Sequence, residues 1–466
     1  MFWCNVALPA PRLVVAGVIL GAALAVPSAV AQGPPSFDWA VSGGGLGSDD
    51  ADGIGIDPFG RPVISGGFDG TSSFDAGHSL TSAGGTDVFA AGYNKRGRVR
   101  WVKRFGGAGP DQAFDSDVDS KADAVLTGSF NRTVDFGTGP LTSRGGTLPR
   151  YGDAFLVKLG ALGRTKWVRQ IGGTGSDGGD EVAIGRQNRI YVIGDSDGDT
   201  NFGSGTVVPN TGGRDSWAAN FSRTGRLRWA RSLGGPGTQQ AHGISSDPKG
   251  HALVTGEFQG TSVFGSHRLD SAGAQPDVYL AKLGRTGGVL WAQRLGGAAR
   301  DIGRGVDADA KGHIYVSGEF AGTIQLGSTT LTSVGGDDSF VAKLTPRGRV
   351  LWATRLGLPG NEIGPEIEVD GSGNSYLTGS SIVNGARAAW VTKLGPRGKV
   401  RWTVGSSASP FATLGELALG PGTVGVLGRY AGQVTLGRFS LQGAGQTDFF
   451  LAQLPRDGSA AARKRR

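Results

Sequence analysis

A tryptophan followed by paired glycines, as in VLWAQRLGG at residues 289–297, recurs along the whole chain. Successive copies are 62, 66, 62, 62, 61 and 50 residues apart. A nearly fixed period of this length is the signature of solenoids and propellers. The repeat therefore limits the fold to an array of similar units. The tryptophans of this pattern are Trp39, Trp101, Trp167, Trp229, Trp291, Trp352 and Trp402.

The residues of each unit indicate four short β-strands. An alternating stretch such as RGVDADA (304–310) leads to a turn such as 370–373, whose first Asp and last Gly suit a type I turn. A second strand such as HIYVSGEF (313–320) and a variable F-x-G-T segment follow, and then a third strand such as DSFVAKL (338–344). The fourth strand carries the tryptophan. No segment shows ten or more residues of helical periodicity.

The two ends of the chain predict a closed ring. The first unit begins with only a tryptophan strand (36–42), and the last ends after its third strand (448–454), so each end lacks what the other has. We therefore expect an all-β fold, a seven-bladed β-propeller of four-stranded antiparallel blades. The N-terminal strand is expected to complete the last blade, which removes both exposed strand edges at the seam.

The phrases W-x(4)-G-G, D-x-x-G, Y-V-x-G and D-x-F-V-A-K-L are most complete between Trp291 and Leu344. They resemble the bacterial secreted β-propeller repeat, or SBBP repeat, over nearly all of the chain that follows the N-terminal apolar segment. This resemblance implies an exported propeller and brings no agreed activity with it. The sixth unit departs from the pattern because it lacks the F-x-G-T segment, and Trp352 and Trp402 lack the full glycine pair.

The N-terminal residues predict export. Residues 1–31 hold Arg12, an apolar run over 13–26 and a small-x-small end at 29–31, the pattern of a cleaved signal peptide. A retained N-terminal anchor is the alternative, although the run is shorter than the ~20 residues of a membrane helix. With the signal removed, we expect no transmembrane span and a secreted, periplasmic or cell-surface location.

The rest of the chain is expected to form a propeller over 36–455 and a basic, disordered tail over 456–466. The net charge of +8 does not predict a nucleic-acid partner, because Arg12 and the four basic residues 463–466 account for five charges and leave the body near +3. The tail is read as solvated, with adhesion to an acidic surface as the alternative.

Motifs of common enzyme classes are weak or missing. Residues 173–178 satisfy G-x-G-x-x-G but open no helix, so a dinucleotide site is not expected. The five histidines lack metal-ligand spacing, no nucleophile elbow occurs, and the single cysteine, Cys4, lies in the predicted signal. The glycine pairs are instead expected to supply positive φ angles or tight turns between blades.

One loop offers candidate metal ligands. The stretch DSDGDTN places Asp195, Asp197, Asp199 and Asn201 at alternate positions, and hard oxygen ligands suit Ca²⁺. The loop lacks a bidentate Glu at its twelfth position, and its glycine is misplaced for a calcium loop. A solvated turn is therefore the competing interpretation.

Acidic residues recur at one position of the predicted innermost strands. Asp117, Asp307 and Glu368 occupy this position in three units, so some of them could face a central channel and hold a cation or polar ligand. The competing interpretation, which we favour, is that short strands beside a water-filled channel tolerate charge.

These observations favour an exported, non-catalytic binding or interaction scaffold that acts as a monomer. Its loops would bind an unknown protein or glycan, because variable loops on rigid blades suit binding. The alternatives are a polysaccharide hydrolase or lyase of propeller fold, which needs a convergent carboxylate pair, and a structural protein of the cell envelope.

Overall fold

A computed structural model describes residues 34–145, 152–357, 360–383, 385–407, 409 and 411–458. The predicted signal peptide 1–31 and residues 459–466 of the predicted tail lie outside the described residues. Within the described ranges, no helix is long and apolar enough to cross a membrane.

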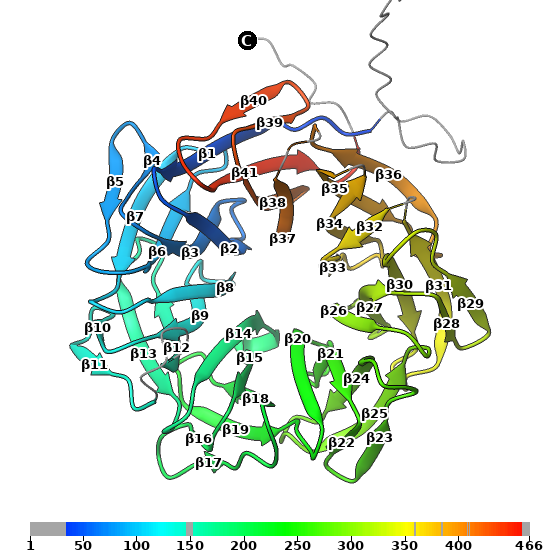
Figure 1. Ribbon diagram of the computed structural model, residues 1–466. Coiled ribbons are helices and arrows are strands. Elements are labelled where there is room, and N and C mark those ends of the chain that lie inside the picture. The colour runs from blue at the N-terminus through cyan, green and yellow to red at the C-terminus, as the bar shows by residue number, and fades with distance from the viewer. Residues whose placement is uncertain are drawn as a thin grey trace, which may run out of the picture. The chain divides into compact units, whose positions relative to one another are not determined.

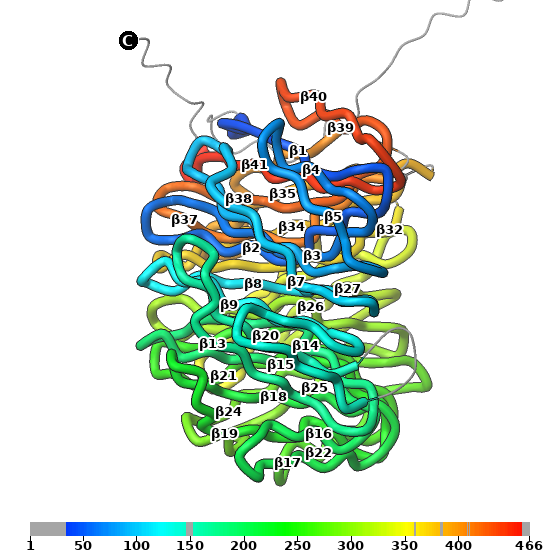
Figure 2. Tube along the Cα trace, turned by 90° about the vertical axis from the view of Figure 1, so that its left-hand side faces the viewer, coloured from blue at the N-terminus to red at the C-terminus, as the bar shows by residue number. Residues whose placement is uncertain are grey.

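The described chain forms a seven-bladed β-propeller, as the repeat predicts (Figure 1). Each blade is a sheet of four antiparallel strands, and the blades follow one another around a central channel in chain order. Figure 2 shows the blue β1 and the red β41 in adjacent positions, where the ring closes.

Four strands make up each blade, from the channel outward. The innermost strands of blades 1 to 7 are β2 (Asp49–Ile56), β8 (Gln112–Val118), β14 (Asp177–Ile184), β20 (Thr238–Ser246), β26 (Asp301–Ala308), the pair β32 (Asn361–Ile363) and β33 (Ile367–Val369), and β37 (Ala412–Gly420). The second strands are β3 (Pro62–Phe68), β9 (Ala124–Phe130), β15 (Ile190–Ser196), β21 (Ala252–Gln259), β27 (Ile314–Phe320), β34 (Ser375–Val383) and β38 (Thr423–Tyr430). The third strands are β6 (Asp87–Tyr93), β12 (Asp153–Leu159), β18 (Asp215–Phe221), β24 (Asp277–Leu283), β30 (Asp338–Leu344), β35 (Ala386–Leu394) and β41 (Asp448–Pro455). The outermost strands are β7 (Val99–Phe105), β13 (Thr165–Ile171), β19 (Leu227–Ser232), β25 (Val289–Leu295), β31 (Val350–Leu356), β36 (Val400–Gly405) and β1 (Trp39–Gly45).

The segments between the second and third strands form small hairpins on six blades. Blade 6 lacks one, as expected from its sequence, and there β34 passes directly into β35. A single short 3₁₀ helix, η1 (Arg186–Asn188), occurs in the part of the chain that the structure describes. The hairpins are β4 (Thr71–Asp75) with β5 (His78–Thr81), β10 (Thr133–Asp135) with β11 (Pro140–Thr142), β16 (Thr200–Asn201) with β17 (Val207–Val208), β22 (Thr261–Phe264) with β23 (His267–Asp270), β28 (Thr323–Leu326) with β29 (Thr329–Thr332), and β39 (Gln433–Leu436) with β40 (Phe439–Gln442).

The N-terminal strand closes the ring, which confirms the prediction. Strand β1 pairs antiparallel with β41, with Trp39 opposite Gln453 and Gly43 opposite Phe449. Because β1 follows β41 in the sheet, blade 7 reaches its full four strands only through this pairing.

The repeated tryptophan joins neighbouring blades. The indole of Trp101 in blade 1 donates a hydrogen bond of 3.1 Å to the carbonyl of Ala161 in blade 2. It also lies against Gly163, where an added Cβ atom would come within 2.7 Å of the ring and where φ is +75°. Apolar packing and one polar tip are what an interface tryptophan supplies. Trp101 therefore packs between neighbouring blades.

The glycine pair is explained chiefly by a close approach. A Cβ atom on Gly106 would lie 2.3 Å from the Asp87 carboxyl carbon, and one on Gly234 would lie 2.4 Å from that of Asp215. Neither glycine has a positive φ, so a positive φ does not explain the pair at these positions. The space is needed by the buried Asp that begins the third strand in six of the seven blades.

A Lys of the third strand neutralises the Asp of the inner turn. The inner turn is the turn that joins the first and second strands of a blade. Lys158 lies 2.6 Å from Asp119, and both side chains are buried. The same pairing recurs between Lys282 and Asp247 at 2.8 Å. A buried charge that loses its partner is strongly destabilising.

Blade 3 has lost both members of this pair together. Asn220 stands where blade 2 has Lys158, and Gly185 stands where blade 2 has Asp119. No unpaired buried charge is therefore left behind. The inner turn of blade 3 becomes η1 instead of the Asp-led turn.

Candidate functional site: an acidic central channel

A β-bulge occurs at the same place on six of the seven innermost strands. The pairing of the first two strands shifts, for example, between Ala113 and Asp115 in blade 2 and between Gly179 and Glu181 in blade 3. The equivalent irregularity occurs in blades 1, 4, 5 and 7, and in blade 6 the strand is split into β32 and β33. A bulge re-aims the side chains that follow it.

After the bulge, two strand positions carry seven acidic residues, and Asp247 and Asp309 of the inner turns also line the channel cavity. We call the two strand positions the four-carboxyl ring and the three-carboxyl ring; they are two residues, or roughly 7 Å, apart along the strand. The four-carboxyl ring consists, from blade 1 to blade 7, of Gly53, Asp115, Glu181, Gly243, Gly305, Glu366 and Glu416. The three-carboxyl ring consists of Gly55, Asp117, Ala183, Ser245, Asp307, Glu368 and Ala418.

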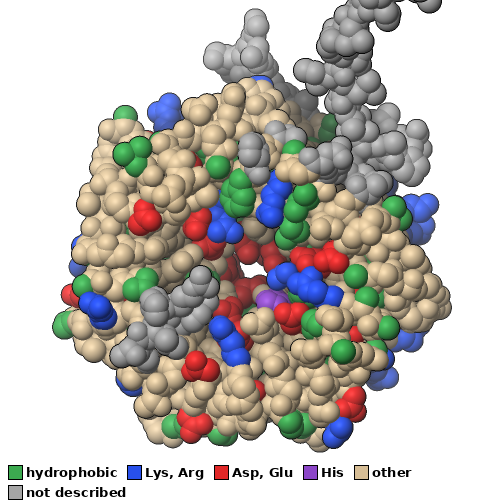
Figure 3. All heavy atoms as spheres, in the orientation of Figure 1, with side chains coloured by type: hydrophobic (Ala, Val, Ile, Leu, Met, Phe, Trp, Pro, Cys, Tyr) green, Lys and Arg blue, Asp and Glu red, His purple; other side chains and the backbone are tan. Residues whose placement is uncertain are grey.

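The channel holds a cavity of about 610 Å³. Six of the seven carboxyl side chains line it, and the seventh, that of Glu366, lies against Gly305 of the neighbouring blade. In Figure 3 the acidic side chains gather around the central opening, with basic side chains and a histidine at its rim.

Carboxylates of blades 2, 3 and 5 hold the next blade by its main chain. Asp115 accepts a hydrogen bond of 2.8 Å from the amide of Val182, and Asp117 accepts one of 2.7 Å from Ile184. The same contact reaches from Glu181 to the amide of Ile244 and from Asp307 to that of Val369. An innermost strand is a sheet edge with unpaired amides, and these acids satisfy some of them.

Three glutamates differ from this group. Glu366, Glu368 and Glu416, on blades 6 and 7, have no side-chain hydrogen bond or ion pair among the described residues. All three are partly exposed, and Glu368 and Glu416 line the channel cavity. Their carboxylates are therefore available to a ligand, whereas those of blades 2, 3 and 5 are engaged in holding the ring together.

Burial and mutual repulsion perturb these acids. Burial, reinforced by the neighbouring Asp117 and Glu366, raises the pKa of Asp115 to about 8. Burial raises the pKa of Glu366 to about 7, with Arg304 opposing the rise. It also raises the pKa values of Glu368 and Glu416 well above the usual range, and nearby carboxyls add to the effect. A cation in the channel would favour ionisation of all of them.

Two basic side chains at the bulge itself have acidic partners on the second strands. Arg304 lies 3.1 Å from Glu319, and His242 lies 3.7 Å from Glu257. Asp180 differs, because one of its carboxyl oxygens is buried without a hydrogen-bond partner in the described chain. Burial, together with the neighbouring Asp195, raises the pKa of Asp180 well above its usual range.

The acids predicted at one repeat position do line the channel. Asp117, Asp307 and Glu368 belong to the three-carboxyl ring, and all three contribute to the cavity wall. The four-carboxyl ring went unpredicted, although the same repeat alignment carries its signal two residues earlier, where glycines alternate with acids. Only the bulge shows that this second position also faces the channel.

The predicted calcium ligands are directed to separate partners. The buried carboxylate of Asp195 accepts a hydrogen bond of 2.6 Å from Ser216, and that of Asp199 accepts one of 3.0 Å from the amide of Asn210. The carboxylate of Asp197 accepts a hydrogen bond from the main-chain amide of Ser176. The side chain of Asn201 accepts one from the main-chain amide of Gly203. Among the described residues, no three His, Cys, Asp or Glu side chains form a group that could hold a metal ion. The calcium site stays a prediction.

Known proteins resemble the chain over much of its length. An uncharacterised WD repeat-containing protein L264 of Acanthamoeba polyphaga mimivirus is 24% identical over 353 residues, which is 67% of this chain and 22% of that protein. The regulatory protein FlaEY of Caulobacter vibrioides is 24% identical over 306 residues, which is 61% of this chain and 28% of that protein. The chain thus spans about a quarter of the length of these relatives.

Some solved structures resemble the chain at low sequence identity. An ulvan lyase of polysaccharide lyase family PL25 gives a TM-score of 0.46 at 10% identity, covering 85% of this chain and 92% of the lyase. A protein of unknown function from Dyadobacter fermentans gives 0.43 at 10% identity, covering 90% and 99%. Likeness at this level carries no argument about activity.

The family comparison agrees with the repeat pattern. The SBBP β-propeller repeat model matches residues 351–385, which run from the outermost strand of blade 5 into blade 6. The matched segment contains the Trp352 strand, the Asp370 turn and the second strand of the next blade. The chain is a seven-bladed β-propeller that carries the SBBP repeat.

Proposed function

We propose that the protein is an exported, non-catalytic binding scaffold and that its central channel binds a ligand with positively charged groups. The observation that carries this proposal is that Glu368 and Glu416 line the channel cavity without partners and that Glu366, also without a partner, lies on the same innermost strand region beside them. Carboxylates that share a low-dielectric space repel one another, and a cationic ligand relieves that repulsion.

The spacing of the carboxyls favours an extended cation over a single metal ion. No three acids of the described chain converge on one point within reach of a metal ion. The two rings are instead separated along the channel axis. A chain with several amine or guanidinium groups matches such an arrangement, because each group can meet one carboxylate.

Titration calorimetry with spermidine, and with Ca²⁺ as a second probe, tests the proposal. Spermidine is expected to bind with release of protons, since the raised carboxyl pKa values fall when a cation is present. The heat should then depend on the ionisation enthalpy of the buffer. The triple variant Glu366→Gln, Glu368→Gln, Glu416→Gln should lose at least about tenfold in affinity, as expected when charge-assisted contacts are removed.

A matched control removes three exposed carboxyls instead. Asp75→Asn, Asp135→Asn and Asp270→Asn remove the same number of carboxyl groups, and all three side chains lie on the peripheral hairpins. This control should bind spermidine like the wild type. Equal weakening in both triple variants, or no spermidine binding, would overturn the proposal.

A second candidate function is polysaccharide cleavage by a hydrolase or lyase activity, and the raised carboxyl pKa values favour it. A glycosidase pairs a protonated carboxyl with an ionised one, and Glu366 with a pKa of about 7 suits the protonated role. A glycan screen with purified protein tests this function. Turnover that disappears in Glu366→Gln would establish the enzyme and overturn the scaffold.

A further inference from the structure

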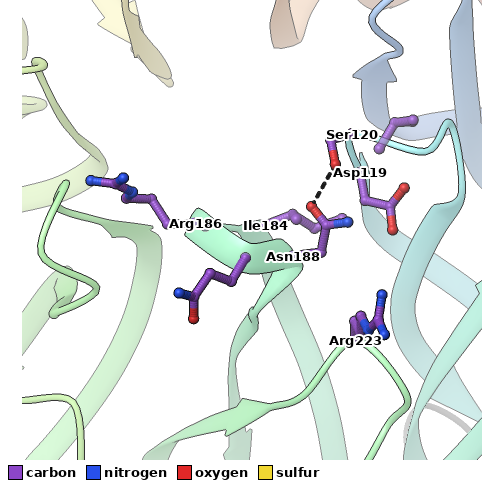
Figure 4. A pocket seen from close by; sticks show the side chains of 9 residues that line it. Asp119, Ser120, Ile184, Arg186, Asn188 and Arg223 are labelled. Atoms are coloured by element: carbon purple, nitrogen blue, oxygen red, sulfur yellow. Dashed lines mark hydrogen bonds between the residues drawn. The ribbon is translucent and has the colours of Figure 1, made fainter.

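The inner turns of blades 2 and 3 enclose a second hollow, of about 610 Å³, beside one end of the channel. It shares part of its wall with the channel cavity, namely Val118 and residues 184–186. Figure 4 shows Asp119 and Ser120 on its blade 2 side and Asn188 and Arg223 on its blade 3 side.

The hollow adjoins the one turn that contains η1. Five inner turns begin with an Asp that accepts hydrogen bonds from the amides two and four residues later, as Asp247 does from Lys249 and His251. Blade 3 has Gly185 at this position, so the turn lacks that carboxylate.

Two adjacent residues of this turn have left-handed backbone conformations. Gln187 has φ +61° and Asn188 has φ +52°, whereas most other inner turns place a glycine at positive φ. A non-glycine residue in this conformation costs about 1–2 kcal/mol. Strain of this kind tends to be retained at functional sites, because the surrounding structure holds it for a purpose.

The groups that face the hollow are mainly donors. Arg223 is exposed and forms no side-chain hydrogen bond or ion pair within the described chain. The side-chain oxygen of Asn188 accepts a hydrogen bond of 3.0 Å from Ser120, which leaves its NH₂ group as the free end. Arg186 extends away from Arg223 in Figure 4 and donates to the carbonyl of Pro248 at 3.0 Å.

The one carboxylate in the wall of the hollow, that of Asp119, already has an ion-pair partner and hydrogen-bond donors. Asp119 is paired with buried Lys158 at 2.6 Å and accepts hydrogen bonds from the amides of Lys121 and Asp123. Lys158 and these amides hold its pKa below the usual range. The hollow therefore presents an uncompensated guanidinium and a free amide donor, without a competing free acid.

We propose that this hollow is an anion-binding subsite, in which Arg223 and Asn188 hold a carboxylate, phosphate or sulfate group. Guanidinium and amide N–H groups are the donors that such oxyanions accept. Arg223 and Asn188 lie outside the carboxyl rings. This proposal is therefore independent of whether the channel binds cations.

Calorimetry with inorganic phosphate, sulfate and D-glucuronate, at constant low ionic strength, tests the subsite. At least one of them should bind saturably. Tighter binding of phosphate or sulfate would identify a tetrahedral oxyanion, and tighter binding of glucuronate would identify a carboxylate. The variant Arg223→Gln should weaken binding about tenfold or more, because a hydrogen bond to a charged group is lost.

Two further variants make the test specific. Asn188→Asp keeps the acceptor for Ser120 and tolerates the left-handed backbone, but it places a negative charge in the hollow, so it should also abolish binding. Arg226→Gln removes an equal charge from the same outer turn, and Arg226 does not line the hollow. It should bind like the wild type. No saturable binding, or equal weakening by Arg226→Gln and Arg223→Gln, would overturn the proposal.

Discussion

Replacing Glu366 with Gln should stabilise the propeller at neutral and alkaline pH. Burial raises the pKa of Glu366 from its ordinary 4.5 to about 7, with Arg304 opposing and Glu319 adding to the rise. At about 1.4 kcal/mol for each pKa unit, this difference corresponds to about 3 kcal/mol of unfolding free energy lost when the carboxyl ionises. Glutamine keeps the shape of the side chain and removes the charge, so the variant should recover up to that amount.

The direction of this pH dependence follows from the pH range in which the folded and unfolded chains bind the proton. Below about pH 4.5 the carboxyl is protonated in both the folded and the unfolded chain, so wild type and Glu366→Gln should be equally stable. Between pH 4.5 and about 7 the unfolded chain releases the proton while the folded chain keeps it, so wild-type stability falls as the pH rises. Above about pH 7 the carboxyl is ionised in both states, and the full loss of unfolding free energy is present. The advantage of the variant should therefore grow across this window and then stay constant.

Urea unfolding followed by tryptophan fluorescence, at pH values of about 4, 5.5, 7 and 8.5, measures this advantage. Glu319→Gln is the opposing control, because Glu319 is paired with Arg304 at 3.1 Å and accepts a hydrogen bond of 2.6 Å from the Gly364 amide. It should destabilise the propeller near neutral pH. An advantage of Glu366→Gln that is equal at pH 4 and 8.5, or a loss of stability at pH 8.5, would refute the reasoning.

Three further predictions concern the frame of the propeller and the acidic loop. Lys158→Met should cost about 3–5 kcal/mol in urea unfolding, because it leaves Asp119 buried without its partner; Asp119→Gly with Lys158→Asn, which copies blade 3, should cost clearly less than the sum of its single changes, and simple additivity would argue against the pairing. Deleting residues 36–42 removes most of the strand that pairs with β41 and should lower the melting temperature markedly in calorimetry, so an unchanged curve would contradict ring closure. If the acidic loop binds Ca²⁺, calorimetry should show binding that Asp197→Ala abolishes, and binding that survives in this variant would place the ion elsewhere.

The sequence predicted the parts of the fold that repeat. Periodic tryptophans gave the number of blades, the turn residues gave the strands, and the mismatched ends gave the closure. These inferences succeed because each blade must satisfy the same local constraints. The role of the glycine pair was predicted less well, since the close approach of Asp87 to Gly106 is a contact between side chain and backbone that no local pattern states.

The site was predicted only in part. The repeat position of Asp117, Asp307 and Glu368 was found because all three follow one register, but Glu416 and the rest of the four-carboxyl ring depend on a bulge that shifts the register. The local sequence pattern also does not predict whether a carboxylate has a hydrogen-bond partner. Glu181 and Glu416 occupy equivalent positions, yet only Glu181 has a main-chain donor from the next blade in the described structure.

The sequence by itself determined the repeat, the all-β class and the ring of seven blades, because periodicity and turn chemistry are local properties. Only the tertiary structure decided which acids share the channel, which of them hold neighbouring blades, and which hollow Arg223 and Asn188 line together. Those properties arise where separate blades come together. Burial and the distances between charges there, rather than residue type, set the pKa values and leave some groups free to bind.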